Sequence, residues 1–286
     1  MNPLGVHALV WVGDWTAPSA RQAIEATAAA GYDLIEIPVL DPSSVDTTLT
    51  RTLLDEYALS GACSLGLSFD ADISSPDATV AGRGYDLLDE ALTVTRGIGG
   101  TYLGGVLYSA LGKYPGPPTE AGRRNCVTSL RHLAASAADD GITVGLEVVN
   151  RYESNLLNTA EQALDLVDEI GADNVVIHLD TYHMNIEETD FTTPIERCGD
   201  RLGYVHVGES NRGPLGSGTV DFEAVFGALQ AASYTGPITF ESFSSAVVDP
   251  VLSNTLAIWR NLWSDGAEVA RTARKFVVEG MSAAGS

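Results

Sequence analysis

Four side chains that can bind a metal ion stand at the ends of four successive apolar segments in the second half of the sequence. They are Glu147 in GLEVVN, Asp180 in HLDTYH, His206 in YVHVGE and Glu241 in ITFESF. Each would be costly to bury alone among apolar residues, and a shared cation removes most of that cost. Three carboxylates and one imidazole suit Mn²⁺, Mg²⁺ or Co²⁺ and leave positions for water or substrate oxygens. This pattern predicts one divalent metal site, with Mn²⁺ as the favoured ion.

Other residues near these segments could contact a ligand or pack in the core. His178 lies two residues before Asp180 and therefore on the same face of a strand. It could lie beside the metal ligands or belong to the core, and we favour the core. His7, Trp11 and Trp15 flank the end of the first apolar segment. Two interpretations stay open for this aromatic group: packing, or a wall of a sugar-binding pocket in which His7 and Trp15 contact the substrate.

Eight apolar segments alternate with eight amphipathic segments along the whole chain. The apolar segments are nearly continuous rather than alternating, which is typical of strands buried on both faces. The predicted strands are residues 5–11, 33–38, 62–67, 101–106, 142–148, 174–180, 202–207 and 237–241, and the predicted helices are residues 17–30, 46–59, 77–97, 120–140, 159–170, 192–199, 221–232 and 250–263. Eight such units in 286 residues match a closed (β/α)₈ TIM barrel, whose active sites lie at the C-terminal ends of the strands. The four metal-capable side chains all fall at such ends.

The chain shows no internal linker, charge run or low-complexity segment. We therefore expect a single domain over residues 1–286, with a tail that frays after about residue 276. The three cysteines have no metal-ligand or disulfide-framework spacing, which favours a reducing compartment. No signal-like segment and no apolar run of about 18 residues is present, so we expect a cytoplasmic protein that does not cross a membrane.

The charge balance indicates what kind of partner the protein has. Sixteen Lys and Arg against 38 Asp and Glu give a net charge of −22. Such a chain repels phosphate backbones and anionic lipids, because nucleic-acid binding depends on Lys and Arg contacts. Nucleic acid is disfavoured as a partner, and a small neutral or metal-bound substrate is favoured.

Four motifs closely resemble the ketose 3-epimerases, the D-tagatose 3-epimerase and D-psicose (allulose) 3-epimerase family of the xylose-isomerase-like barrels. They are LEVVNRYE (146–153), LDTYHMNIEE (179–188), HVGESNRG (206–213) and FESF (240–243). The resemblance implies a metal site of Glu147, Asp180, His206 and Glu241. It also implies substrate contacts from Glu153, His183 and Arg212, and assembly as a homodimer or homotetramer.

The same resemblance implies a mechanism for inverting C3 of a ketose. Glu147 and Glu241 would act as base and acid on opposite faces of the sugar, through a cis-enediolate. His183 and Arg212 would donate hydrogen bonds to the oxygen that gains charge, and Glu153 would fix a neighbouring hydroxyl. Because the segment 212–222 carries one Arg and no cluster of cations, a free ketose such as D-fructose, D-psicose, D-tagatose, D-sorbose or L-ribulose is expected rather than a sugar phosphate.

Three alternative functions use similar residues. An aldose–ketose isomerase would move the carbonyl between C1 and C2, and a sugar dehydratase would expel a hydroxyl with the same metal. A non-catalytic sugar- or metal-binding protein would not need two opposed glutamates. The pair Trp259 and Trp263, at helical i,i+4 spacing in the last predicted helix, could pack on the barrel or contribute to assembly.

Overall fold

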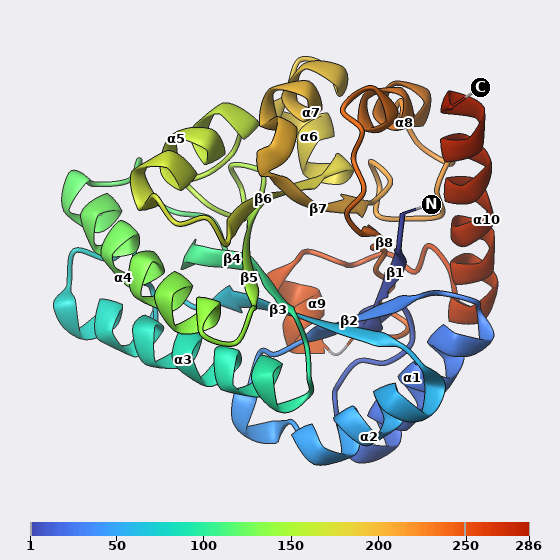
Figure 1. The fold of residues 1–286 in the computed structure, drawn as a ribbon, viewed down its shortest axis with the longest axis horizontal. Helices are drawn as coiled ribbons and strands as arrows, with labels where there is room; N and C mark the ends of the chain where they lie inside the picture. Colours follow the sequence, from blue (N-terminus) through green and yellow to red (C-terminus); the bar gives the residue numbers. More distant parts are fainter. Residues whose placement is uncertain (1, 249, 286) are drawn as a thin grey trace.

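The computed structural model describes residues 2–248 and 250–285, which form a closed barrel of eight parallel strands in chain order (Figure 1). The strands are β1 Leu4–His7, β2 Leu34–Pro38, β3 Ser60–Leu67, β4 Tyr102–Ala110, β5 Thr143–Val148, β6 Val175–Asp180, β7 Leu202–Val207 and β8 Ile238–Phe240. Each strand is almost wholly buried, because helices cover the outer face and side chains fill the interior. The predicted (β/α)₈ barrel is confirmed.

Ten helices, within the described residues, surround the barrel or cover one end of it. They are α1 Ala17–Ala29, α2 Thr47–Tyr57, α3 Ala78–Gly97, α4 Glu120–Ala138, α5 Ala160–Ile170, α6 Thr181–Glu187, α7 Thr192–Cys198, α8 Phe222–Ala231, α9 Pro250–Thr255 and α10 Gly266–Ala284. Side-chain caps set several of the beginnings: Asp46 accepts from the Leu49 N–H at 2.9 Å and Asp221 from the Ala224 N–H at 3.0 Å. Most of these helices return the chain to the start of the next strand.

The strand register brings side chains from neighbouring strands to one level inside the barrel. Glu147 pairs with His178, and Asp180 pairs with His206. Paired residues of parallel strands point to the same face, as do residues two apart on one strand. Glu147, Asp180 and His206 therefore all point into the barrel at its C-terminal end, and Glu241 directly follows β8.

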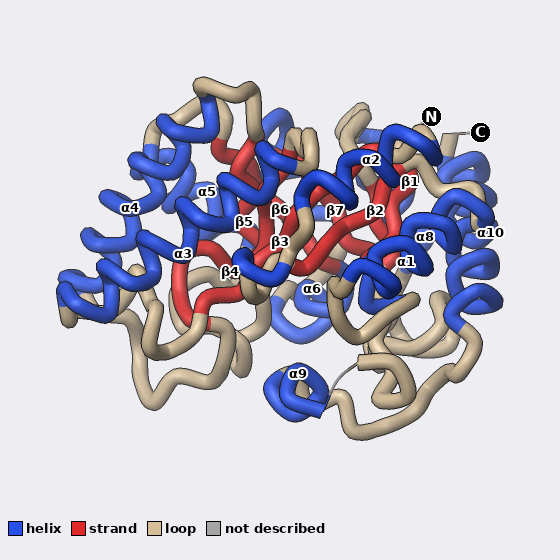
Figure 2. Tube along the Cα trace, turned by 90° about the horizontal axis from the view of Figure 1, so that it is seen from below, coloured by secondary structure: helices blue, strands red, loops and turns tan. Residues whose placement is uncertain are grey.

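The predicted helix over 250–263 is wrong in its second half. Helix α9 ends at Thr255, and Ala257 takes a left-handed φ of 54° that stops helical continuation. The Trp259 side chain is 73% exposed, whereas Trp263 is buried and its indole N–H donates to Ser242 Oγ at 2.8 Å. The two tryptophans are therefore not an i,i+4 pair on a helix. Figure 2 shows α9 set apart from the other helices, across the end of the barrel where the strands finish.

The expectation that the tail frays after residue 276 is also wrong. Helix α10 runs to Ala284 and packs along α8, with Val277 and Met281 buried and the Phe276 ring 5.2 Å from that of Phe222. The helix begins at a capping pattern that the sequence does show, since Asp265 accepts from the Glu268 N–H at 3.0 Å. The helix is ordered because its apolar face is buried against α8, although it lies near the end of the sequence.

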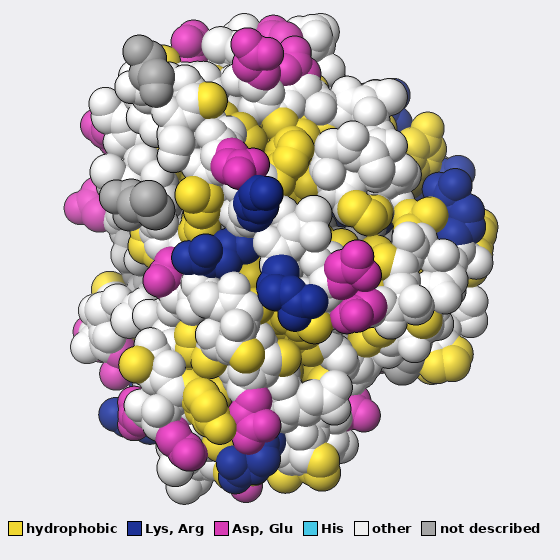
Figure 3. Space-filling view, turned by 90° about the vertical axis from the view of Figure 1, so that its right-hand side faces the viewer, with side chains coloured by type: hydrophobic (Ala, Val, Ile, Leu, Met, Phe, Trp, Pro, Cys, Tyr) yellow, Lys and Arg dark blue, Asp and Glu magenta, His cyan; other side chains and the backbone are white. Residues whose placement is uncertain are grey.

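The described helices include none that is long and apolar enough to cross a bilayer. On the face drawn in Figure 3, Lys and Arg side chains lie among Asp and Glu side chains.

The docking of α10 leads to a stability prediction. Val277→Ala removes buried methyl groups and should lower the free energy of unfolding by about 2 kcal/mol. Thr272→Ala, at an exposed position of the same helix, should change it by less than about 0.5 kcal/mol. Chemical denaturation followed by circular dichroism measures both, and an unchanged Val277→Ala midpoint would show that α10 is not docked.

Candidate active site

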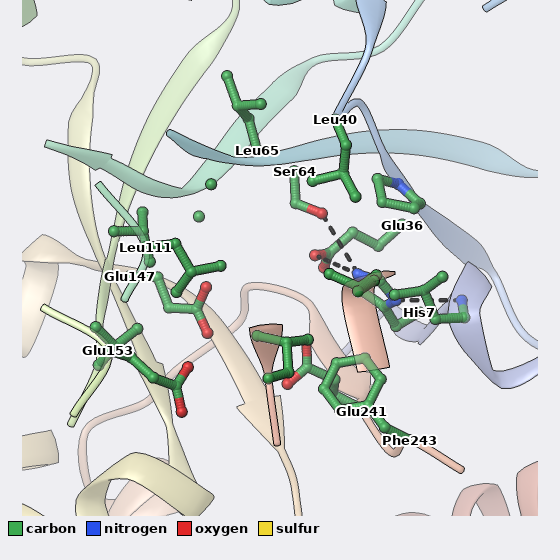
Figure 4. A pocket seen from close by; sticks show the side chains of 18 of the residues that line it. His7, Glu36, Leu40, Ser64, Leu65, Leu111, Glu147, Glu153, Glu241 and Phe243 are labelled. Atoms are coloured by element: carbon green, nitrogen blue, oxygen red, sulfur yellow. Dashed lines mark hydrogen bonds and ion pairs between the residues drawn. The ribbon is translucent and has the colours of Figure 1, made fainter. Parts of the chain in front are cut away.

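A pocket opens at the C-terminal end of the barrel. One group of its lining residues is ionisable or polar: His7, Glu36, Ser64, Glu147, Glu153, His183, Arg212 and Glu241. The remaining lining residues are apolar or glycine and include Phe243, Leu252 and Leu256, the last two from α9 and the turn after it. Figure 4 shows Glu147 and Glu241 pointing toward the same space from opposite sides, with Glu153 beside Glu147. This lining suits a small polar molecule.

The four predicted metal ligands come together around one point. One ligand atom from each of Glu147, Asp180, His206 and Glu241 lies within 4.8 Å of those of the other three, and all four residues are buried. They come from β5, β6, β7 and the residue after β8, so four neighbouring strands each supply one ligand. The structure thus brings together the set that the sequence suggested.

The state of the His206 imidazole fits a divalent cation at this point. Its Nε2 lies 2.7 Å from Glu36 Oε2, whereas its buried Nδ1 has no hydrogen-bond partner among the described residues. Glu147 Oε1 and Glu241 Oε1 lie 3.4 and 3.6 Å from Nδ1. A buried nitrogen without a hydrogen-bond partner costs free energy. A metal ion or a water molecule bound to its lone pair removes that cost. The donor set of three carboxylates and one imidazole nitrogen is one that Mn²⁺, Mg²⁺ and Co²⁺ accept.

The pKa values of the two site glutamates are shifted in opposite directions. Burial raises the pKa of Glu147 to about 7, although His206 opposes the rise. Burial also acts to raise the pKa of Glu241, but the charges of Arg212 and His206 outweigh it and lower that pKa below its usual value. Two carboxyls with pKa values moved apart can act as acid and base in one site.

His183 turns the Nε2 edge of its ring toward the pocket. The Asn150 N–H donates to its Nδ1 at 3.1 Å, and its Nε2 lies 3.2 Å from Arg212 Nη2. Burial lowers the pKa of His183 to about 3, which keeps the ring neutral. Its Nε2 lies 3.9 Å from Glu147 Oε1 and 4.0 Å from Glu153 Oε2. The residues expected to contact substrate therefore border the same space as the candidate metal ligands.

Arg212 connects the loop after β7 to this cluster. Its Nη1 lies 2.9 Å from Asp180 Oδ2 and also contacts Glu241 Oε2. Its guanidinium stacks on the Tyr182 ring at 3.9 Å. The backbone of Arg212 has a φ of 60°, uncommon for a residue with a Cβ, and the Ser242 hydroxyl donates to its carbonyl at 2.6 Å. The loop therefore directs the one cation among the lining residues toward the carboxylates.

Of the aromatic residues near β1, His7 lines the pocket and the tryptophans pack in the core. His7 lines the pocket, with its Nε2 at 3.5 Å from Ser64 Oγ. Trp15 does not line the pocket: it is buried in the core, and its indole N–H donates to Thr50 Oγ1 at 3.1 Å. The sugar-wall interpretation is therefore corrected for Trp15, which packs, as buried Trp11 does. His178 is fully buried, and one of its ring nitrogens lies within 4.8 Å of ligand atoms of Glu147 and His206.

The sequence analysis missed Glu36. This residue of β2 is fully buried, lines the pocket and holds His206. A glutamate in the apolar segment LIEIP was the only available signal, and a lone strand glutamate is usually an exposed residue. Its partner lies 170 positions away, so the contact depends on barrel closure.

Comparisons with known proteins agree with this geometry. Residues 24–273 match the family described as xylose isomerase-like TIM barrel. The chain is 54% identical over 273 residues to an L-ribulose 3-epimerase of Methylomonas sp. (strain DH-1), covering 96% of each chain. It is 48% identical to a ketose 3-epimerase of Arthrobacter globiformis, covering 98% of this chain and 97% of the relative. A crystal structure of a D-allulose 3-epimerase from Methylomonas sp. in complex with D-allulose superposes with a TM-score of 0.96 at 52% identity, covering 97% and 96% of the two chains.

Occupation of this site should stabilise the protein. Adding Mn²⁺ at about 100 times its dissociation constant should raise the free energy of unfolding by about 2.7 kcal/mol, because the ion binds the folded state and not the unfolded chain. Asp180→Asn keeps the side-chain shape but removes one charge, and a tenfold loss of affinity would reduce this gain by about 1.4 kcal/mol. Thermal melting with and without Mn²⁺ measures the difference. Equal gains for both proteins would place the ion elsewhere.

Proposed function

The chain belongs to the xylose isomerase-like TIM barrel family and, within it, to the ketose 3-epimerases, and from this premise we propose that it inverts C3 of free ketoses at the pocket described above. The observation that carries the proposal is the pair Glu147 and Glu241. These buried carboxyls point into one space from opposite sides, and their pKa values are shifted in opposite directions.

Inversion at C3 requires one proton to leave from one face and another to arrive on the other. An ionised carboxylate removes the C3 proton, and the electrons of the C–H bond form the C2–C3 double bond of a cis-enediolate with negative charge on O2. A protonated carboxyl on the opposite face then returns a proton to C3. Glu147 and Glu241, which point into the pocket from opposite sides, are the two carboxyls that we assign as base and acid. The reverse reaction exchanges the two roles.

Glu147, Asp180, His206 and Glu241 would hold a divalent cation, for which we propose Mn²⁺ ahead of Co²⁺ or Mg²⁺. When bound, the cation supplies Lewis-acid stabilisation of negative charge on the substrate. His183 Nε2 and the Arg212 guanidinium donate toward the same part of the pocket, and we assign them to O2. Glu153, which accepts from Asn150 Nδ2 at 2.9 Å, fixes a neighbouring hydroxyl.

An uncharged substrate suits the pocket better than a sugar phosphate. Arg212 is the one Lys or Arg among the lining residues, and it is already paired with Asp180 and Glu241. A phosphate would therefore meet carboxylates without a free cation. We propose the pairs D-fructose and D-psicose, and D-tagatose and D-sorbose, together with L-ribulose. A homodimer or homotetramer remains a prediction, which light scattering tests.

A glutamine substitution separates proton transfer from metal binding. Glu147→Gln or Glu241→Gln keeps an oxygen donor of similar shape but removes the group that carries the proton. Turnover should fall by at least about 10²-fold, whereas Mn²⁺ should still bind, about 10–100-fold more weakly. Glu223→Gln, at an exposed position of α8, is the control and should retain full activity. Either site variant with a tenth of the native turnover at saturating Mn²⁺ would refute the two-glutamate mechanism.

The proposed function is tested by identifying the products. Metal-loaded protein should convert D-fructose to D-psicose, D-tagatose to D-sorbose and L-ribulose to L-xylulose, separated by chromatography. A chelator should abolish conversion, and Mn²⁺ or Co²⁺ should restore it better than Ca²⁺, which prefers more ligands at longer distances. An aldose product would indicate an isomerase, and a new ultraviolet absorbance would indicate a dehydratase. Full turnover by metal-free protein would contradict the metal requirement.

A further inference from the structure

We propose that Glu36 is a positioning residue for the metal centre: it holds the Nε2–H of His206, so that Nδ1 keeps its lone pair and directs it at the three carboxylates. This inference rests on the metal site proposed above. It assigns a role to a buried carboxylate that neither binds the cation nor transfers the C3 proton in that mechanism.

The contact is made across the inside of the barrel. Glu36 lies on β2 and His206 on β7, two strands that are separated in the sheet by β1 and β8. Glu36 Oε2 lies 2.7 Å from His206 Nε2, with the two side chains each 1% exposed. A hydrogen bond at this distance between fully buried groups fixes both side chains.

The hydrogen bond from His206 to Glu36 determines which nitrogen of the imidazole ring can bind a metal ion. A neutral ring carries a proton on one nitrogen and a lone pair on the other, and only the lone pair can bind a metal ion. Because a carboxylate only accepts hydrogen bonds, Glu36 requires the proton to be on Nε2. Nδ1, which has no hydrogen-bond partner among the described residues, is then the nitrogen left to bind the ion, 3.4 Å from Glu147 Oε1. Carboxylates that hold metal-bound histidines in this way raise metal affinity in other proteins.

Neighbouring rings hold the plane of His206 in the matching orientation. The His178 ring packs edge-on against it with centroids 4.1 Å apart, and the Tyr204 ring lies at 5.7 Å. These contacts restrict rotation of the ring but do not select which nitrogen carries the proton. That selection requires a charged or polar partner at Nε2, and Glu36 supplies it.

Stability alone does not account for Glu36. Its ion-pair partners among the described residues are two histidines, His206 and, at 3.6 Å from Oε1, His7. No Lys or Arg in this part of the chain pairs with it, and Oε1 makes no hydrogen bond. A buried carboxylate of this kind costs free energy to desolvate and seldom stabilises a fold. We therefore expect Glu36 to contribute when a metal ion is bound, by holding His206 in the tautomer that binds the ion.

The test compares the Mn²⁺ affinity of three variants with that of the wild type, using chelator-stripped protein and electron paramagnetic resonance of free Mn²⁺. Glu36→Gln keeps an acceptor for Nε2–H but loses the charge, and should bind Mn²⁺ about 10-fold more weakly. Glu36→Leu loses both and should bind about 100-fold more weakly. Asp72→Asn is the control, since buried Asp72 accepts from Tyr114 Oη at 2.6 Å and does not line the pocket. It should alter the melting temperature but leave Mn²⁺ affinity within twofold.

The order wild type, Gln, Leu in affinity, with metal-free proteins that remain folded by circular dichroism, supports the proposal. If Glu36→Leu does not fold, Glu36→Gln alone decides, because it is nearly isosteric with the native residue. Folded Glu36 variants that bind Mn²⁺ within twofold of the wild type would overturn the role of Glu36 while leaving the metal centre and the epimerase function intact. A wild type that binds no Mn²⁺ would overturn the metal centre itself, and the role of Glu36 with it.

Discussion

Repulsion among carboxylates buried at one end of the barrel is the constraint on which the site depends. Glu36, Glu147, Asp180 and Glu241 lie in a region of low dielectric, where unpaired charges are expensive. Arg212 neutralises part of this charge through Asp180 and Glu241, and Glu36 has His206. The remaining negative charge lies around the point that the ligand atoms share, which is where we propose that a divalent cation binds. Burial raises the pKa of Glu147, whereas the charges of Arg212 and His206 lower the pKa of Glu241.

The strands and loops of the barrel determine where these charged side chains lie. Parallel register and the inward direction of alternate residues bring one ligand side chain each from β5, β6 and β7 to the C-terminal end of the barrel. The loops add what strands cannot: Arg212 reaches back from the segment after β7, and α9 brings Leu252 over the apolar side of the pocket. Rigid strands therefore carry the groups whose spacing matters for chemistry, and loops carry those that surround the substrate.

The sequence was informative where function leaves a local pattern. Glu147, Asp180, His206 and Glu241 could be found because each interrupts an apolar strand at its end, and the barrel follows from eight repeated units. Glu36 and Trp15 could not be assigned, because the position of each depends on a neighbour far away in sequence. The end of α9 depends on one left-handed residue, Ala257, which is not glycine and gives no signal. Helix α10 was not predicted, although Asp265 caps its start, because its apolar face is ordered only by packing against α8.

The central claim is that two different carboxyls handle the C3 proton, and isotope incorporation tests it most directly. When metal-loaded protein runs the reaction in D₂O, one carboxylate keeps the proton taken from C3. The other carboxyl, which has exchanged with solvent, delivers deuterium to the opposite face of the sugar. The account predicts one deuterium at C3 of the epimerised product, located by nuclear magnetic resonance. Product without deuterium at C3, or with deuterium only at C1, would contradict it.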